Sequence, residues 1–403
     1  MARAHRLRLE AGLPIADLTA SSPTRCGFAY PDSLLDALTD PRALDYDPQP
    51  KGLISAREGV CRYYAGRGVT LDPGQIVLTT STSEAYSFLF RLLCDQGSEV
   101  LILEPGYPLF DFLAGLDDVR LKAAPLVYEN GWQIDVEGVR RAISADTRAI
   151  VVVHPNNPTG HFTKPWEADQ LARLCREFGL ALIVDEVFLD YAKAGNEGAS
   201  EQGSGTTGNG ETRDQGTKAT GSFAAGMEGV QVLVVSGLSK IAGLPQMKAA
   251  WIAVTGPERE QALARLEVIA DTFLSMNAPV QWALPKWIEG CGAIQKQIRE
   301  RVAANLAALD RGLAAAPAVQ RLVIEGGWYA VLRIPAVRPD EQTVLKLLER
   351  GVWVHPGYFF GMPESGWLVV SLLAPEPEFV AGVTTLIDLL GTNHQGNVSE
   401  RFV

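Results

Sequence analysis

Short apolar runs alternate with amphipathic stretches along the first two-thirds of the chain. Runs of this length, rich in β-branched residues, predict strands, and the helical spacing between them predicts connecting helices. We therefore expect an α/β domain with a mostly parallel sheet that is flanked by helices on both faces. The predicted strands occupy residues 75–79, 99–103, 149–153, 180–185, 230–236 and 249–254.

The pattern changes near residue 295, where a long amphipathic stretch predicts a helix over 295–315. Shorter apolar runs then alternate with one more helical segment and a closing helix, which predicts a smaller α+β domain. These runs lie at residues 326–335, 353–359 and 367–373.

The two patterns predict a division of the chain into domains. We expect a large domain over 46–290 and a C-terminal small domain over 291–403, with the N-terminal segment 1–45 as part of the small domain. Residues 194–222 are almost entirely Gly, Ser, Thr and charged residues. Such a segment buries too little apolar area to offset its ordering entropy, so we expect a flexible insertion in the large domain.

Charge and composition exclude several classes of function. The net charge of −11 and the pI near 5.1 argue against binding to nucleic acid or to an anionic membrane. No apolar run approaches the roughly 20 residues of a membrane-spanning helix, and the N-terminus lacks the features of a secretory signal. We therefore expect a cytoplasmic protein. The five cysteines and five histidines form no ligand-spaced pair, so we expect reduced thiols and no metal site.

Polar residues follow the predicted strands at the edge of the sheet where ligands bind in such folds. Asp185 ends the apolar run 180–185, and a carboxylate there is costly unless it meets a cation or a donor. The turn 154–160, HPNNPTG, follows another strand and contains Asn157. A capping role for Asp185 and a simple connecting turn for 154–160 remain the structural alternatives.

Two further strand ends carry candidate binding groups. Thr82 and Ser83 begin an amphipathic helix directly after a strand, where free N–H groups and hydroxyls form an anion site. An ordinary helix cap that involves Glu84 is the alternative. Tyr107 follows the run 99–103 and is either a core residue or a platform for a flat ring.

Lys240 lies in the turn SGLSK after a fifth strand and could by itself be a surface charge. Combined with the candidate groups at the other strand ends, Lys240 indicates one kind of chemistry. A lysine forms a Schiff base with a carbonyl, and an aldehyde-bearing pyridine phosphate needs an acidic partner, a stacking aromatic ring and a phosphate site.

At this point the chain resembles a known family. NNPTG, then DEVF 28 residues after Asn157, then SGLSK are similar to the motifs of the fold-type I pyridoxal-phosphate enzymes, and specifically of the class I/II aminotransferases. The resemblance covers nearly the whole chain, and it implies the PLP transferase-like fold and pyridoxal 5'-phosphate as the cofactor.

The resemblance also implies roles for single residues. Lys240 would form the Schiff base and later move a proton, and Asp185 would keep the pyridine nitrogen protonated. Asn157 would bind the phenolic oxygen, and Tyr107 would stack on the ring. The phosphate would be held by Thr82, Ser83 and either Ser236 or Ser239.

Tyr46, in YDPQPKGL, resembles the tyrosine that reaches the phosphate of the neighbouring subunit. This resemblance implies a homodimer with shared active sites.

Three positions depart from the family pattern. Phe188 stands where the family usually has a tyrosine that donates to the phenolic oxygen, and Lys248 replaces an arginine that binds the phosphate. Val369 stands where the family usually has the arginine that binds the substrate's α-carboxylate. Arg25 is our candidate replacement for that cation, and a solvated loop arginine is the alternative.

The prediction is therefore an aminotransferase that moves an amino group between an amino acid or amine and a keto acid. Another pyridoxal-phosphate reaction is the first alternative, because cofactor and lysine alone do not decide which bond breaks; a C–S lyase, a decarboxylase and a cyclising lyase are examples. A non-catalytic cofactor-binding sensor is the second alternative.

Overall fold

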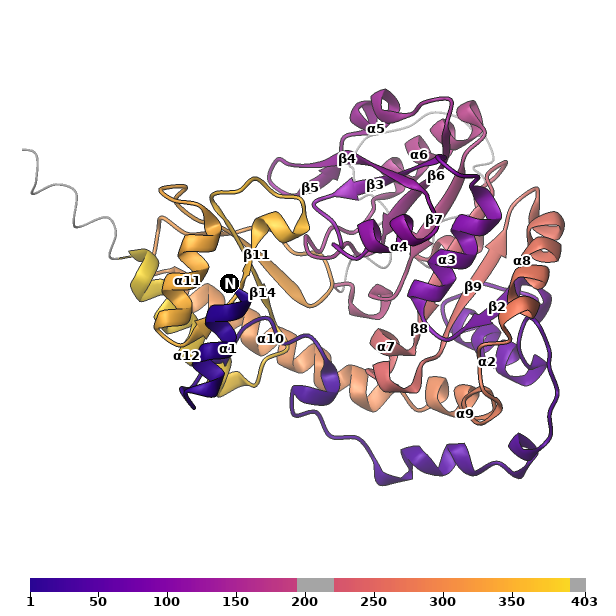
Figure 1. Cartoon of the computed structure of the whole chain (residues 1–403), viewed down its shortest axis with the longest axis horizontal. Coiled ribbons are helices and arrows are strands. Elements are labelled where there is room, and N and C mark those ends of the chain that lie inside the picture. The colour runs from indigo at the N-terminus through magenta and orange to yellow at the C-terminus, as the bar shows by residue number, and fades with distance from the viewer. Residues whose placement is uncertain (194–220, 392–403) are drawn as a thin grey trace, which may run out of the picture.

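A large sheet and the helices on its two faces form the greater part of the molecule (Figure 1). The structure, a computed structural model, describes residues 1–193 and 221–391. Across this sheet the strands lie in the order β2 (Ile76–Thr79), β9 (Ala250–Thr255), β8 (Val232–Gly237), β7 (Ala181–Asp185), β6 (Thr147–Val153), β3 (Glu99–Glu104), β4 (Arg120–Tyr128) and β5 (Trp132–Ile134).

Most neighbouring strands of the large sheet run parallel. β9 is antiparallel to both β2 and β8, and β5 is antiparallel to β4, whereas the pairs from β8 to β4 are parallel. The predicted mostly parallel sheet is therefore confirmed. The carboxyl ends of β2, β3, β6, β7 and β8 share one edge, so the residues that follow these strands are brought together.

Helices cover both faces of the large sheet, as predicted. Strand β7 shows the alternation that this requires, because Ile183 packs in a different apolar cluster from its neighbours Leu182 and Val184. The Ile183 side is covered by α3 (Thr82–Leu93), α4 (Phe110–Leu116) and α8 (Arg259–Phe273). The other side is covered by α2 (Ile54–Ala65), α5 (Val136–Ala142), α6 (Pro165–Phe178), α7 (Leu238–Ile241) and α9 (Ala278–Glu289).

Two strands of the large sheet, β4 and β5, were missed by the sequence pattern. They form one edge of the sheet, and half of β4 faces solvent. The first residues of β4 alternate polar and apolar, and Pro125 lies in its second half, so the strand did not match the pattern of the buried strands.

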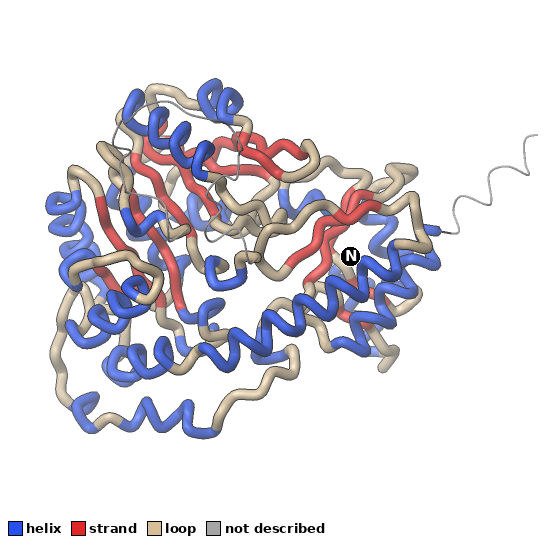
Figure 2. The backbone as a smooth tube through the Cα atoms, turned by 180° about the vertical axis from the view of Figure 1, so that it is seen from behind, coloured by secondary structure: helices blue, strands red, loops and turns tan. Residues whose placement is uncertain are grey.

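A small antiparallel sheet lies in the C-terminal part, as the α+β pattern predicted. Its strands, in order, are β10 (Gln320–Arg321), β11 (Tyr329–Arg333), β14 (Trp367–Ser371) and β13 (His355–Pro356). The helices of this part are α10 (Gly292–Leu313), α11 (Asp340–Glu349) and α12 (Glu376–Gly391). Figure 2 shows the long helix α10 running from beneath the large sheet to the small one.

The N-terminal segment contacts both parts of the molecule. Helix α1 (Ala2–Glu10) lies beside α11 (Figure 1). Strand β1 (Ala16–Asp17) pairs with β12 (Val352–Trp353). Further along, the carbonyl of Leu34 accepts a hydrogen bond from Trp287 in α9. The domain boundaries at 45/46 and 290/291 stay a prediction.

The connections include turns of 3₁₀ helix, at η1 (Pro23–Arg25), η2 (Asp32–Thr39), η3 (Pro41–Leu44), η4 (Pro73–Gln75), η5 (Leu189–Tyr191), η6 (Phe223–Ala225), η7 (Pro245–Met247) and η8 (Gly357–Phe360). No helix in the described parts of the chain is long and apolar enough to cross a membrane.

Most of the predicted insertion 194–222 lies outside the described residues. Its last two residues are described, and Ser222 is buried and donates a hydrogen bond to Oε2 of Glu186 at 2.8 Å. The expectation of a flexible surface position was therefore wrong for Ser222.

Candidate active site

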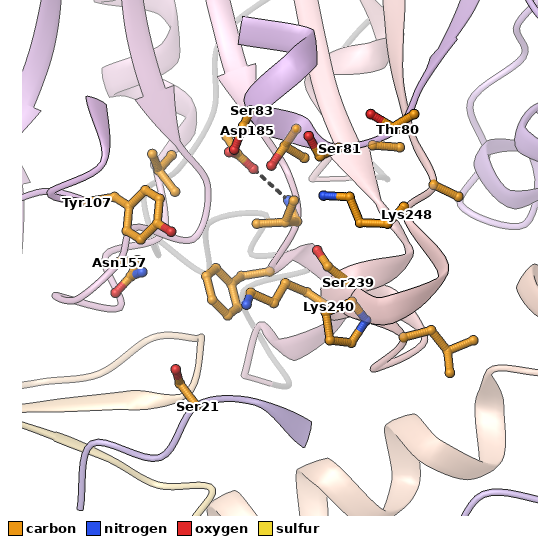
Figure 3. A pocket seen from close by; sticks show the side chains of 18 of the residues that line it. Ser21, Thr80, Ser81, Ser83, Tyr107, Asn157, Asp185, Ser239, Lys240 and Lys248 are labelled. Atoms are coloured by element: carbon orange, nitrogen blue, oxygen red, sulfur yellow. Dashed lines mark hydrogen bonds between the residues drawn. The ribbon is translucent and has the colours of Figure 1, made fainter. Parts of the chain in front are cut away.

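A cavity of about 260 Å³ opens at the shared edge where β2, β3, β6, β7 and β8 end (Figure 3). Its wall combines a carboxylate, two lysines, several hydroxyls and two tyrosine rings. The polar and aromatic side chains that line it are Ser21, Thr80, Ser81, Thr82, Ser83, Tyr107, Asn157, Asp185, Phe188, Ser239, Lys240, Lys248 and Tyr329.

Lys240 enters the cavity from the short helix α7. The preceding Gly237 permits this turn, because a Cβ at that position would lie 2.8 Å from the Cβ of Ala250. The Lys240 Nζ lies 5.2 Å from the ring centroid of Trp328 and 5.8 Å from that of Phe188. Burial lowers the pKa of Lys240, and the nearby Asp185 opposes the shift. A lowered pKa enlarges the fraction of neutral amine, which is the nucleophilic form.

Asp185 ends β7 and points into the same cavity. Its Oδ1 accepts a hydrogen bond from the Val187 N–H at 3.0 Å, and its Oδ2 accepts one from the Tyr86 hydroxyl at 3.1 Å. Burial raises the pKa of Asp185 to about 6, although these two donors and Lys240 oppose the shift. The carboxyl is therefore mostly ionised at neutral pH and suits a cationic or donating partner.

The beginning of α3 lines the cavity on the opposite side from Tyr107, and its free N–H groups and hydroxyls suit an anion. Ser81 caps the helix, since its Oγ accepts from the Glu84 N–H at 3.1 Å and Oε2 of Glu84 accepts from the Thr80 N–H at 2.7 Å. The helix cap and the anion site thus coexist, because Thr82 and Ser83 line the cavity as well. Figure 3 shows the ammonium of Lys248 directed toward Ser81 and Ser83.

Asn157 and Tyr107 lie together on another wall (Figure 3). Asn157 is buried, and its Oδ1 has no hydrogen-bond partner among the described residues. Buried amide oxygens are normally paired, so an unpaired one in a cavity wall indicates a ligand. The Tyr107 ring packs edge-on against Phe110 at 6.0 Å, which fixes its orientation.

Most of the site residues predicted from the sequence meet at this cavity. They are Thr82, Ser83, Tyr107, Asn157, Asp185, Phe188, Ser239, Lys240 and Lys248.

Three predicted residues do not line it. Ser236 is fully buried within β8, so of the two alternatives only Ser239 reaches the cavity. Tyr46 is 84% exposed, and Arg25 is exposed on η1. Val369 is fully buried in β14, between Val331 and His355 of the neighbouring strands.

Sequence reasoning missed several residues of the site. Tyr86 lies on the buried face of α3, where its apolar spacing made it look like an ordinary core residue. Trp328 and Tyr329 follow two glycines at the start of β11, and Ser21 lies in the N-terminal segment. The aromatic pair after Gly326 and Gly327 was visible in the sequence, but only the fold places it beside Lys240.

Comparisons with known proteins identify the family to which this cavity belongs. Residues 32–378 match the family model described as aminotransferase class I and II. The alanine aminotransferase of Mycobacterium tuberculosis is 28% identical over 97% of this chain and 89% of its own length. The glutamate-pyruvate aminotransferase of Escherichia coli K12 is 26% identical over 72% of this chain and 67% of its own length.

Solved structures show the same fold. An alanine aminotransferase from Pyrococcus furiosus has a TM-score of 0.83 at 21% identity and covers 96% of this chain and 95% of its own. An aspartate aminotransferase double mutant of Thermus thermophilus has a TM-score of 0.79 at 25% identity, with coverage of 96% and 95%.

Class I and II aminotransferases use pyridoxal phosphate. The cavity fits this group, because it presents an anion site, an ionised carboxylate, an unpaired buried amide oxygen, an aromatic ring and a lysine of lowered pKa. Because the family model matches most of this chain, the chain belongs to the pyridoxal-phosphate-dependent aminotransferases of class I and II.

Proposed function

We propose that this aminotransferase moves an amino group between an α-amino acid and an α-keto acid, with Lys240 as its catalytic residue. The observation that carries the proposal is the enclosed position of Lys240 in a cavity that also holds an ionised carboxylate and an anion site. Amino acid and keto acid substrates are implied by the family.

Each residue of the cavity has a proposed task. The hydroxyls and N–H groups of Thr82, Ser83 and Ser239 bind the cofactor phosphate, and Lys248 adds a positive charge without the bidentate fork of an arginine. Asp185 accepts a hydrogen bond from the ring nitrogen. When bound, the cofactor supplies an electron sink for the carbanion that forms at the substrate carbon.

Asn157 and Tyr107 orient the ring from the opposite wall. The Asn157 side chain offers an amide to the phenolic oxygen, and the Tyr107 ring covers one face. Phe188 leaves the phenolic oxygen without the tyrosine donor of the family, so Asn157 carries this contact. The Phe188 and Trp328 rings lie beside the Lys240 amine, with centroids 5.8 and 5.2 Å from Nζ.

Lys240 performs the proton transfer. Burial keeps a fraction of its amine neutral, and the neutral Nζ could accept the proton from the substrate carbon. The protonated Nζ would then be the acid that gives the proton back, since a group that accepts a proton can also donate it.

The printed names of the relatives suggest which substrates to test first. We propose two donor and acceptor pairs: alanine with the keto acid of glutamate, and glutamate with the keto acid of alanine. Donor alone should release one keto acid per active site and then stop until an acceptor is added. Continued release of ammonia or carbon dioxide without an acceptor would instead indicate the lyase or decarboxylase alternative.

Arg25 is the proposed cation for the substrate carboxylate. It is exposed on η1, in the segment whose Ser21 lines the cavity, while the family's position for this arginine is the buried Val369. We expect Arg25→Ala to raise the KM for the amino donor about tenfold, the loss of one hydrogen bond to a charged group.

The matched control for Arg25 is Arg265→Ala, which removes an exposed arginine on α8. Steady-state kinetics of both variants separate a local effect from a general loss of charge. An unchanged KM in Arg25→Ala would exclude Arg25 from substrate binding.

We also propose a homodimer in which Tyr46 reaches the phosphate of the partner subunit. Tyr46 is 84% exposed and does not line the cavity of its own chain. We expect Tyr46→Phe to weaken cofactor binding about tenfold, because a hydrogen bond to a charged phosphate is lost.

The control for Tyr46 is Leu44→Ala, at a position of the same segment that is 89% exposed. Cofactor affinity is measured by equilibrium titration, and the molar mass by light scattering. A monomeric mass, or equal affinity in Tyr46→Phe and wild type, would contradict the shared site.

A further inference from the structure

The Tyr86 hydroxyl lies directly behind the carboxylate of the cavity. Tyr86 is almost fully buried in α3 and does not line the cavity itself, yet its hydroxyl donates to Oδ2 of Asp185 at 3.1 Å. The other oxygen of Asp185 accepts from the Val187 N–H at 3.0 Å. Each carboxylate oxygen thus accepts one hydrogen bond from the described residues.

The position of this hydroxyl is held by aromatic packing. The Tyr86 ring is edge-on to Phe110, with centroids 5.0 Å apart, and tilted against Phe90 at 6.1 Å. Phe110 in turn packs edge-on against Tyr107, which lines the cavity. Because α3 also begins at the anion site, one helix supports both the phosphate end and the carboxylate end of the cavity.

A carboxylate that faces a ring nitrogen competes with it for the same proton. Burial alone favours the protonated carboxyl, whereas donors to the carboxylate favour the ionised form. Both influences act on Asp185: burial raises its pKa to about 6, and the Val187 and Tyr86 hydrogen bonds pull it back down. The strength of these two hydrogen bonds therefore influences whether the shared proton resides on Asp185 or on the ring nitrogen.

We propose that Tyr86 is a positioning residue that holds Asp185 as an ionised acceptor, so that the proton shared with the cofactor's ring nitrogen stays on the nitrogen. The proposal rests on the role of Asp185 proposed above. It goes beyond the packing role that the apolar face of α3 suggests for Tyr86, since a packing role needs only the ring.

The test is the protonation of the ring nitrogen in the holoenzyme, read from its ¹⁵N chemical shift with ring-labelled cofactor. In wild type the nitrogen is expected to be protonated. In Tyr86→Phe, which keeps the ring and removes the hydroxyl, the ratio of protonated to unprotonated nitrogen should fall about tenfold. The kcat should fall in proportion to the protonated fraction of the nitrogen, by at most this factor, while the KM for the amino donor changes less than twofold.

Tyr64→Phe is the matched control. Tyr64 is a fully buried tyrosine in α2 whose hydroxyl accepts from Nε1 of Trp251, away from Asp185. It should leave the ¹⁵N shift unchanged. A second variant guards against a folding defect: 3-fluorotyrosine at position 86 keeps a more acidic hydroxyl, so it should preserve the protonated nitrogen and the wild-type kcat.

Two results would overturn the proposal in distinguishable ways. An equal ratio of protonated to unprotonated nitrogen in wild type and Tyr86→Phe would remove the role of Tyr86 and leave that of Asp185 intact. An unprotonated nitrogen in wild type, unchanged in Asp185→Asn, would remove the proposed role of Asp185 and with it that of Tyr86.

Discussion

Lys240→Ala is expected to lower kcat by roughly 10³-fold or more, within the range of a positioned proton-transfer group. The variant removes both the amine that bonds to the cofactor's aldehyde carbon and the base that moves the proton. The other lysine of the cavity, Lys248, cannot replace it, because its ammonium is directed toward the anion site at the start of α3 (Figure 3).

Borohydride reduction followed by mass spectrometry gives a second measurement on Lys240. Wild type should gain the mass of one cofactor, attached to the peptide that contains Lys240, and Lys240→Ala should gain none. Lys248→Ala is the control, because it should bind the cofactor more weakly and still be labelled at Lys240. A labelled Lys240→Ala protein would place the covalent bond on another residue.

Asp185→Asn is expected to lower kcat by about 10² to 10³-fold, the cost of leaving a buried charge without its partner. Asparagine keeps the shape of the side chain but removes the negative charge that the protonated ring nitrogen needs. Kinetics together with the ¹⁵N shift of the ring nitrogen measure the effect. A kcat within threefold of wild type would exclude Asp185 from the reaction.

Glu186→Gln is the matched control for Asp185. Glu186 is a buried carboxyl on the adjacent residue, but it accepts from Ser222 and from the Phe223 N–H instead of lining the cavity. Its pKa is also raised by burial, to about 7. Its replacement should leave kcat within threefold.

The raised pKa of Asp185 also predicts an effect on stability, with a definite sign. The folded-state pKa of about 6 lies above the ordinary value of 3.8, so the stabilisation associated with the protonated form is lost as the pH rises through about 6. At pH 8 the cofactor-free protein therefore bears the cost of a buried ionised carboxylate. Asp185→Asn should raise the Tm of the cofactor-free protein at pH 8, even as it lowers activity.

The large sheet was predictable because its central strands are buried on both faces. Such strands are continuous apolar runs, and β6, β7 and β8 each follow this pattern. Strand β4, next to the edge, could not be found in the same way, because four of its nine positions are exposed and it contains Pro125. The interior of the sheet was therefore visible in the sequence, and its edge was not.

The residues of the candidate site also differ in whether the sequence could predict them. Residues in the turns directly after strands were found, because parallel strands bring their carboxyl ends to one edge regardless of packing detail. Tyr86 and Trp328 were missed, because one lies inside a helix with apolar spacing and the other directly precedes a strand of the small sheet. Their relation to Asp185 and Lys240 depends on how separate elements pack.

The sequence by itself determined the fold class, the family, the cofactor and the order of binding groups along the chain, because strand periodicity and short motifs are local properties. Only the tertiary structure decided that Ser239 and not Ser236 faces the cavity, that Val369 is buried in the small sheet, and that a tyrosine stands behind Asp185. These facts depend on which face of a strand or helix is covered and by what, and that is settled only when elements distant in the chain pack together.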